Sequence, residues 1–284
     1  MKPFDYFAPQ SLSEAIDVLT EYGSDARILA GGTDLLIELR RPNAKNPQLI
    51  LDISSLAELR QITSDNDSIT INPLATHHEI MLSRAVRESA SLLLSAASMV
   101  GSPQIRNLGT IGGNIMNAAT CADGVPPLIA LGADVTLLSK KGTRQLPLSE
   151  LFVKPYQTKA EANELLTEIK FPKLPPNTKS AFIKLGRRNA VTISRLSVAA
   201  TITRDNDGKI TDARIVPGAA LPVWRRVQEA EELLLGQRPS KELFAAAGKK
   251  VSEVMIGKSG RRWSTEYKEP VIAVLVRRAL EQCV

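Results

Sequence analysis

Cysteine, histidine and tryptophan are the residues that this sequence has least of, since its 284 residues contain two of each. The cysteines, Cys121 and Cys283, lie far apart, so the chain alone is expected to build neither a zinc site nor an iron–sulfur cluster. The histidines are adjacent, and neighbouring side chains on a helix diverge, so His77-His78-Glu79 is interpreted as a polar helix start. We therefore expect no metal on this chain. So few thiols also favour a reducing compartment.

Aromatic residues and long basic runs are scarce too. Aromatics make up 4% of the chain, and the net charge of +6 is spread over doublets such as Arg187-Arg188. Nucleic-acid binding normally needs a clustered basic face, and single-strand binding adds stacking aromatics, so this class of function is excluded. No stretch of eighteen apolar residues occurs, and the N-terminus lacks the apolar core of a signal peptide. The expectation is a cytoplasmic protein without a membrane span.

The first half of the chain alternates helix and strand signals. Ser11 with Glu14, and later Thr76 with Glu79, have the spacing of capping boxes, which mark helix starts. The first of these helices should end near Gly23. Strands are predicted over 27–30, 49–53 and 68–71, and helices over 35–39, capped by Thr33-Asp34, and over 91–100. This pattern indicates a mixed α/β unit.

A proline cluster divides the chain. Pro172, Pro175 and Pro176 enclose a polar stretch that neither a helix nor a central strand tolerates. We therefore predict a linker there, between one domain over 1–172 and another over 177–284. The second part should hold strands over 179–185, 197–203 and 209–216, a hairpin turn at 205–208, and helices over 227–235, 241–256 and 271–282. Strands followed by helices indicate an α+β layer.

Two glycine pairs carry the strongest chemical signal. They lie in Ala30-Gly31-Gly32-Thr33-Asp34-Leu35 and in Gly109-Thr110-Ile111-Gly112-Gly113-Asn114. Glycine allows positive φ and has no side chain, so consecutive backbone N–H groups can turn toward an anion and lie against it. The neighbouring hydroxyl, carboxylate and amide side chains add partners for a phosphate or a sugar hydroxyl. One such pair is an ordinary turn, whereas two indicate loops that converge on one pyrophosphate.

Other phosphate motifs are missing from the sequence. It contains no G-x-G-x-x-G, so the dinucleotide-binding Rossmann fingerprint is absent. Gly257-Lys258-Ser259 resembles the end of a Walker A loop, but Ser252 stands where the first glycine belongs and no strand precedes it. We interpret this tripeptide as a surface turn.

Together these residues resemble a known family. The segments 29–35, 101–115 and Ala122-Asp123 look like those of the FAD-binding subunits of molybdenum hydroxylases, which include the medium subunit of carbon monoxide dehydrogenase and the flavin part of xanthine dehydrogenase. The resemblance runs from Phe4 to the C-terminal helices, and the block from Gly101 to Asp123 is its specific part. It implies an α+β fold with a two-lobed FAD-binding domain of the PCMH (vanillyl-alcohol-oxidase-like) type, its lobes spanning about 1–55 and 56–172. A C-terminal α+β domain with a small antiparallel sheet and helices would follow.

The resemblance also implies which residues hold FAD. Asp123 would bind its ribityl or adenosine side, and Leu166 and Lys184 would contact the isoalloxazine ring. From the residues alone, Lys184 can equally be an exposed strand lysine and Leu166 a core residue. No residue is expected to act as a catalytic acid, base or nucleophile. The pyrophosphate would be held by Leu29, Ala30, Gly31, Gly32, Thr33, Asp34, Leu35 and Leu36 of the first loop and by Thr110, Ile111, Gly112, Gly113 and Asn114 of the second.

A function in electron transfer follows from the resemblance. A flavin accepts electrons singly and releases them in pairs, so it can join one-electron clusters to a two-electron acceptor. The chain would take electrons from [2Fe-2S] clusters on a small partner subunit and pass them to an external acceptor, while a large partner carries the molybdopterin. It lacks the four-cysteine insertion of 4-hydroxybenzoyl-CoA reductases, so no extra cluster is expected. At 189–192 it reads Asn-Ala-Val-Thr, where xanthine dehydrogenases have acidic residues, so NAD is not indicated as the acceptor.

Two other functions stay open on the residues. A stand-alone FAD-dependent oxidoreductase that acts on its own small substrate would need a base over the flavin, and neither histidine falls in a flavin block. A non-enzymatic nucleotide-binding module would need only the two loops. The sequence does not name the substrate of a complex, because the family places that choice on the molybdenum subunit.

Overall fold

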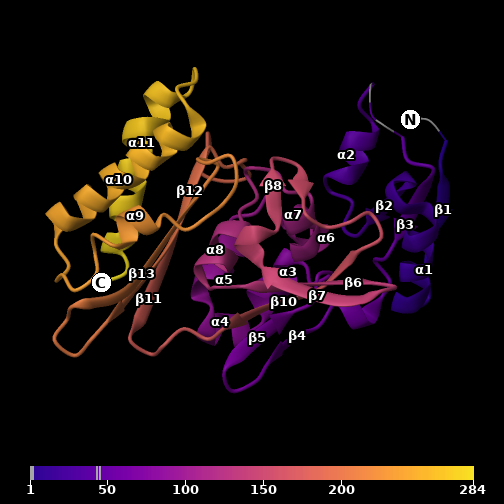
Figure 1. Ribbon diagram of the computed structural model, residues 1–284, viewed down its shortest axis with the longest axis horizontal. Helices are drawn as coiled ribbons and strands as arrows, with labels where there is room; N and C mark the ends of the chain where they lie inside the picture. The colour runs from indigo at the N-terminus through magenta and orange to yellow at the C-terminus, as the bar shows by residue number, and fades with distance from the viewer. Residues whose placement is uncertain (1–2, 43, 45) are drawn as a thin grey trace.

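The structure is a computed structural model that describes residues 3–42, 44 and 46–284. Figure 1 shows three parts along the long axis. A small N-terminal lobe with α1 and α2 lies at one end, and the long C-terminal helices lie at the other. A central unit of sheet and short helices joins them. The expected α+β architecture is confirmed.

The N-terminal lobe is a three-stranded parallel sheet in the order β1-β3-β2. It consists of β1 (Asp5–Phe7), α1 (Leu12–Tyr22), a 3-10 turn (Gly23–Asp25), β2 (Ala26–Leu29), α2 (Leu35–Leu39) and β3 (Leu49–Asp52). The predicted start of α1 is confirmed, since the Glu14 N–H donates to Ser11 Oγ at 3.2 Å. Helix α1 buries Ala15, Ile16 and Leu19 against β3, which fixes the sheet from which the first glycine loop leaves.

The central unit is an antiparallel five-stranded sheet in the order β4-β5-β10-β6-β7 with short helices packed on it. The capping box of Thr76 and Glu79 is present in both directions and starts α3. The strands are β4 (Ile62–Ser64), β5 (Ser68–Ile71), β6 (Asp134–Ser139), β7 (Gly142–Pro147) and β10 (Leu165–Pro172), with a small hairpin of β8 (Phe152–Lys154) and β9 (Gln157–Thr158). The helices are α3 (His77–Leu82), α4 (Arg84–Ser89), α5 (Ser91–Ser98), α6 (Pro103–Leu108), α7 (Ile111–Met116) and α8 (Val125–Ala130), with 3-10 turns at Ala57–Leu59 and Leu148–Glu150.

The C-terminal part is an antiparallel meander of β11 (Thr178–Leu185), β12 (Leu196–Arg204) and β13 (Ile210–Gly218), followed by helices. These are α9 (Gln228–Glu231), α10 (Lys241–Ser259) and α11 (Thr265–Glu281). The helix expected over 227–235 was predicted too long, since α9 ends at Glu231. After α9 the chain forms a tighter turn, in which the Glu231 carbonyl accepts from the Leu234 N–H, and it changes direction at Gly236 with φ +74°.

Two other helix bounds were also predicted wrongly. Helix α10 runs three residues past Ile256 to a positive-φ cap at Gly260. Helix α11 starts at Thr265, six residues before the predicted Val271, and includes Pro270. One local and one tertiary contact hold this first turn and a half: Thr265 Oγ1 accepts from the nearby Arg262 N–H at 2.7 Å, and Lys268 Nζ donates to the distant Ala219 O at 2.7 Å. Such contacts outweigh the one helix bond that a proline removes.

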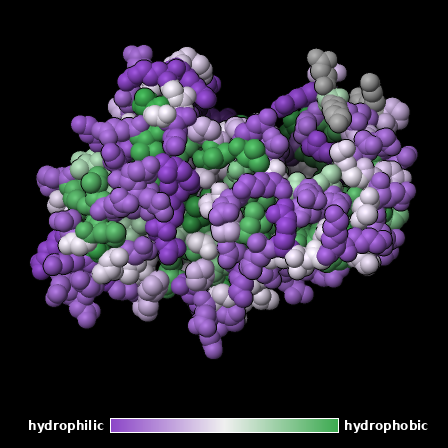
Figure 2. Space-filling model, in the orientation of Figure 1, coloured by the Kyte–Doolittle hydropathy of each residue, from purple (hydrophilic) through white to green (hydrophobic). Residues whose placement is uncertain are grey.

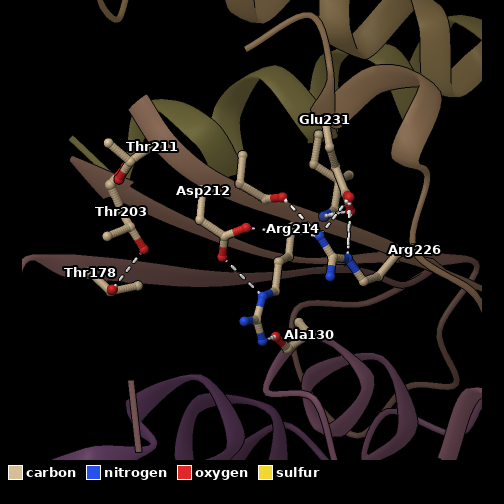
Figure 3. Close-up of polar contacts among 10 residues, drawn as sticks. Ala130, Thr178, Thr203, Thr211, Asp212, Arg214, Arg226 and Glu231 are labelled. Atoms are coloured by element: carbon tan, nitrogen blue, oxygen red, sulfur yellow. Dashed lines mark hydrogen bonds and ion pairs between the residues drawn. The ribbon is translucent and has the colours of Figure 1, made fainter. Parts of the chain in front are cut away.

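The C-terminal sheet packs directly on the central unit. Phe182, Ala199, Val216 and Trp224 are part of the central hydrophobic core, and the ring of Trp224 meets that of Phe152 edge-on, with centroids 4.6 Å apart. Figure 3 shows Arg214 reaching from β13 to the carbonyl of Ala130 at the end of α8, at 2.9 Å. The shared apolar core makes the joint between the two parts a packed interface.

Candidate functional site

The first glycine loop leaves the carboxyl end of β2 and turns into α2. Gly32 adopts φ +69°, a conformation that residues with side chains rarely take, so the turn needs glycine here. A Cβ on Gly31 would stand 1.9 Å from the carbonyl oxygen of Leu108. The backbone of this loop therefore lies directly against the end of α6, and glycine at 31 is what permits that approach.

The first loop presents unpaired backbone donors. The N–H groups of the five successive residues 31–35 donate to no other described residue. Only from Leu36 onward do helical bonds begin, with the Leu36 N–H donating to Gly32 O at 3.1 Å. A row of free N–H groups at the start of a helix is an anion-binding arrangement, because the donors and the helix dipole favour negative charge.

The second glycine loop differs, because its backbone donors, apart from the Thr110 N–H, are already used. The N–H groups of Ile111 and Gly112 donate to Ala75 O and Pro73 O at 2.9 and 2.8 Å. The Gly113 N–H donates to Thr110 Oγ1 at 3.0 Å, which caps α7. A Cβ on Gly112 would strike Pro73, at 2.4 Å from its Cβ. The expectation that both loops cradle an anion through rows of N–H groups therefore needs refinement: in this structure the second loop offers a close wall with one free donor, the Thr110 N–H.

Several contacts bring the two loops together. Asn117 Nδ2 donates to Asp34 Oδ2 at 2.9 Å, linking the end of α7 to the first loop. A Cβ on Gly109 would lie 3.6 Å from Thr33 Oγ1, so these two segments also touch. Gly113 is exposed, and a Cβ there would meet nothing beyond its own capping partner, Thr110 Oγ1. The open face of the site thus runs from Gly31 to Leu35 and past Gly113.

Asp123 and Lys184, predicted as separate cofactor contacts, are bonded to each other. Lys184 Nζ lies 2.7 Å from Asp123 Oδ2 and also donates to Met99 O at 2.8 Å, while Ser194 Oγ donates to Asp123 Oδ1 at 2.5 Å. The side chains of Asp123 and Lys184 are 7% and 6% exposed. Burial raises the pKa of Asp123, and the lysine and the serine hydroxyl oppose that effect.

This buried pair adjoins the glycine loops. Asn114 Oδ1 accepts from the Gly124 N–H at 3.1 Å, which ties α7 to the segment that carries Asp123. Burial, and then the carboxylates of Asp123 and Asp34, raise the pKa of the Cys121 thiol, so Cys121 lies within electrostatic reach of both. Lys184 is not the exposed strand lysine that its position in β11 also allowed.

Leu166 is a predicted site residue whose side chain lies in the hydrophobic core. It lies in β10, is 2% exposed and belongs to the hydrophobic core of the central unit. The other residues of the first loop, from Leu29 to Leu36, and of the second, from Thr110 to Asn114, lie together as predicted. Leu36 is exposed beside the loop, and Ile111 is buried beneath it.

Sequence reasoning missed the side chains that position the loops. Asn117, Ser194 and the Met99 carbonyl make their contacts across 71 to 85 residues of chain, which no local pattern reveals. His77 was set aside as a polar helix start, yet it is buried with Nδ1 unpartnered, and its N–H donates to Gly109 O at 3.0 Å. The sequence does not show that His77 lies beside the second loop, because this proximity depends on the β-bridge between Thr76 and Thr110.

Neither a metal site nor a membrane-spanning helix is found among the described residues. Among them, no three His, Cys, Asp or Glu side chains lie together as a metal site would require. No helix in this part of the chain combines the length and apolar character needed to cross a bilayer.

Comparison with known proteins identifies the family. Residues 2–174 match the family model described as "FAD binding domain in molybdopterin dehydrogenase", and residues 181–283 match that of the "CO dehydrogenase flavoprotein C-terminal domain". The nicotinate dehydrogenase FAD-subunit of Eubacterium barkeri is 35% identical over 273 residues, covering 95% of this chain and 92% of that protein. The carbon monoxide dehydrogenase medium chain of Hydrogenophaga pseudoflava is 31% identical over 277 residues, covering 98% and 96%.

Comparison of the three-dimensional fold supports the same family. The solved carbon monoxide dehydrogenase from Hydrogenophaga pseudoflava that lacks the Mo-pyranopterin moiety matches with a TM-score of 0.93 at 30% identity, covering 100% of this chain and 98% of that one. Quinoline 2-oxidoreductase from Pseudomonas putida 86 matches with a TM-score of 0.90 at 25% identity, covering 99% and 98%. The chain therefore belongs to the FAD-binding medium subunits of the molybdenum hydroxylase family, and it is a flavoprotein subunit of an oxidoreductase.

Proposed function

We propose that the free N–H groups of residues 31–35 bind the pyrophosphate of FAD, with the second glycine loop as the opposite wall. This row of unpaired donors is the observation that carries the proposal, because a buried or half-buried N–H without a partner is otherwise unfavourable. The Thr33 hydroxyl and the exposed Gly113 lie beside it. The carboxylate of Asp34, already held by Asn117, would accept from a ribose or ribityl hydroxyl rather than face a phosphate.

We propose that Lys184 and Asp123 act near the flavin ring as one unit. The Lys184 ammonium is fixed by Asp123 and the Met99 carbonyl, so a positive charge is held at one place without water around it. The pair is neutral overall, so its ammonium would favour an anionic, reduced ring by lying nearer to the ring than the carboxylate does. Leu166, which was predicted at the ring, would act from beneath through packing, since its side chain is in the core.

The proposed role is that of a relay in a heteromeric complex. FAD, when bound, supplies the chemistry of accepting electrons singly and releasing them in pairs. We propose that a small [2Fe-2S] subunit delivers the electrons, that a large molybdopterin subunit carries out the substrate chemistry, and that an external acceptor removes the electrons. Full-length similarity to the medium chain of carbon monoxide dehydrogenase supports this assignment.

Two finer statements belong to the same proposal. The division into a two-lobed domain over 1–172, with lobes about 1–55 and 56–172, and a second domain over 177–284 is supported by separate sheets on either side of each boundary. A cytoplasmic location is supported by Cys121 and Cys283, which are both free thiols.

The cofactor claim is tested by acid precipitation of the purified chain. Neither glycine loop contains a Cys or His that could form a flavin link, so non-covalent FAD should appear in the supernatant. Yellow colour that stays in the pellet contradicts non-covalent binding. Recovery of FMN alone contradicts pyrophosphate binding by residues 31–35.

The relay claim is tested by anaerobic bleaching of the visible flavin band. Dithionite should bleach the isolated chain, whereas an organic substrate should do so only when the cluster and molybdenum subunits are present, because no group of side chains that could hold a metal is found among the described residues. Bleaching of the isolated chain by an organic substrate would replace the relay with a stand-alone oxidoreductase.

A further inference from the structure

A hollow of about 230 Å³ lies between the central unit and the C-terminal helices, and no residue of the two glycine loops lines it. Thr120 and Pro155 line it from the central unit, and the segment 219–222 lines it from the end of β13. The remaining wall is the end of α10 and the start of α11, including Arg262 and Lys268. The hollow therefore opens on the seam where the two parts of the chain meet.

The floor of the hollow is positively charged and lacks a counter-charge. Lys268 donates to Ala219 O, and Arg262 to Ser259 O, but neither side chain forms an ion pair with any described carboxylate. Arg195 lies close by, with its guanidinium 4.9 Å from the centroid of the Tyr267 ring. Partial burial and the charges of Arg195 and Arg262 lower the pKa of Lys268, with no carboxylate acting in the opposite direction. Three cations are thus held together at an electrostatic cost that an incoming anion would remove.

The two most exposed aromatic side chains are sequence neighbours of residues that line the hollow. Trp263, beside the lining residue Arg262, is 87% exposed, and Tyr156, beside the lining residue Pro155, is 69% exposed. Aromatic side chains next to arginines, around a depression, are typical of the anchor points of protein interfaces. Figure 2 shows hydrophobic surface gathered in the upper middle of this view, between the C-terminal helices and the central unit.

The backbone at the hollow is strained. Ala219 and Tyr156 have φ of +55° and +61°, which is uncommon for residues with a side chain. The strain at Ala219 coincides with the carbonyl that accepts from Lys268, and the strain at Tyr156 presents the ring outward. Unfavourable conformations of this kind tend to mark functional surfaces.

The dimensions decide between a small ligand and a polypeptide. Sites that enclose a drug-sized ligand or cofactor are commonly about 300–1,000 Å³, whereas this hollow is smaller, and the exposed rings of Trp263 and Tyr156 are not among its lining residues. A single carboxylate side chain fits the floor, and flanking apolar residues of the same segment fit against the two rings. We propose that this hollow docks a carboxylate-bearing segment of a partner subunit, with Arg262 and Lys268 as the charge receptor and Trp263 and Tyr156 as the apolar anchors.

This inference rests on the proposed membership of a heteromeric complex, and it adds the place and chemistry of one contact. The test is co-expression of the full chain with the small and large subunits of its complex, followed by affinity capture and titration of the binding strength at two salt concentrations. The variants are Arg262→Glu and Trp263→Ala, both at exposed positions. The matched controls are Lys141→Glu and Leu82→Ala, which change an exposed basic and an exposed apolar residue elsewhere.

We expect at least a tenfold weaker dissociation constant for each test variant, with FAD content unchanged and with Arg262→Glu losing most of the salt dependence of binding. The controls should stay within twofold of the unmodified chain. Normal assembly by both test variants overturns the docking site while the relay function stands. Failure of the unmodified chain to capture either subunit overturns both. Saturable binding of inorganic phosphate in the hollow, with assembly unaffected by the variants, overturns the docking site in favour of a small-anion site.

Discussion

The Nζ of Lys184 and the Oδ2 of Asp123 lie 2.7 Å apart in a place that water scarcely reaches. Lys184 comes from β11 and Asp123 from the segment before α8, so this ion pair joins the C-terminal sheet to the central unit. Each charge is satisfied further, the ammonium by Met99 O and the carboxylate by Ser194 Oγ. A pair of this kind is costly to break from one side, because the remaining charge stays buried without a partner.

Lys184→Met should therefore destabilise the protein by about 3–5 kcal/mol, the usual cost of stranding one half of a buried pair. The double variant Lys184→Met with Asp123→Leu should recover much of this loss, because no buried charge is left. Urea unfolding of the apo-protein gives these free energies. Arg84→Met is the matched control: its partner Glu88 is exposed, so its loss should cost less than about 1 kcal/mol. Equal losses in Arg84→Met and Lys184→Met would show that the buried pair has no special weight.

Gly31 and Gly113, one from each loop, should differ in which substitutions they tolerate. Gly31→Ala should disturb the loops and the flavin site together, because its Cβ would meet the Leu108 carbonyl oxygen at 1.9 Å. Gly113→Val should leave the apo-protein folded yet empty of FAD, because Gly113 is exposed and its side chain would project toward the proposed pyrophosphate. Flavin content together with the urea midpoint of the apo-protein separates the two effects. Full flavin occupancy in Gly113→Val would remove the second loop from the site.

Local chemistry explains which parts of the fold the sequence revealed. The starts of α1 and α3 were readable because Ser11 and Thr76 bond within their own first turns. The turn between β12 and β13 was readable because Asp205 and Gly208 close it locally. The start of α11 was not, because its first residues are held by Ala219 and by the side chain of Arg195, which are distant in sequence.

The candidate site, too, was predictable from the sequence only where local chemistry determines it. Glycine pairs with nearby hydroxyls marked both loops, since the need for positive φ at Gly32 is a local property. Whether a loop's N–H groups are free depends on which strand ends lie beside it. In the second loop, the N–H groups of Gly112 and Ile111 donate to the carbonyls of Pro73 and Ala75, and no residue within 109–114 predicts these contacts. The bond between Asp123 and Lys184 likewise spans 61 residues.

His77 should titrate at an unusually low pH. Burial, aided by the charge of Arg106, lowers the pKa of His77 to about 4, so the imidazole is neutral near pH 7. Because the folded-state pKa lies below the unfolded value of 6.5, stability is lost as the pH falls from 6.5 toward 4, by up to about 3 kcal/mol. The chain has only two histidines, so NMR of the imidazole Cε1 protons resolves both, and His78→Gln assigns them. A His77 midpoint near 6.5 would contradict its burial beside the second loop.

The pair of Arg226 and Glu231 should respond unequally to loss of either partner. Glu231 is buried and accepts from the Ile215 N–H at 2.8 Å as well as from Arg226, whose side chain is partly in solvent (Figure 3). Arg226→Met leaves a buried carboxylate with one donor and should cost about 2–4 kcal/mol. Glu231→Gln keeps an acceptor for the Ile215 N–H and frees a solvated guanidinium, so it should cost about 1 kcal/mol.

The pH dependence of Arg226→Met provides the sharper measurement. Burial already raises the pKa of Glu231, and loss of the guanidinium removes the main effect that opposes it. A carboxyl group whose folded-state pKa is raised binds its proton more tightly when folded. Stability is then greatest below the unfolded-state pKa and falls as the pH rises through the folded-state pKa. The deficit of Arg226→Met relative to the unmodified chain should therefore shrink as the pH is lowered from 7 toward 4, whereas that of Glu231→Gln should not. A deficit in Arg226→Met that is constant over this range would show that Glu231 is solvated, and that the link between β13 and α9 depends on packing alone.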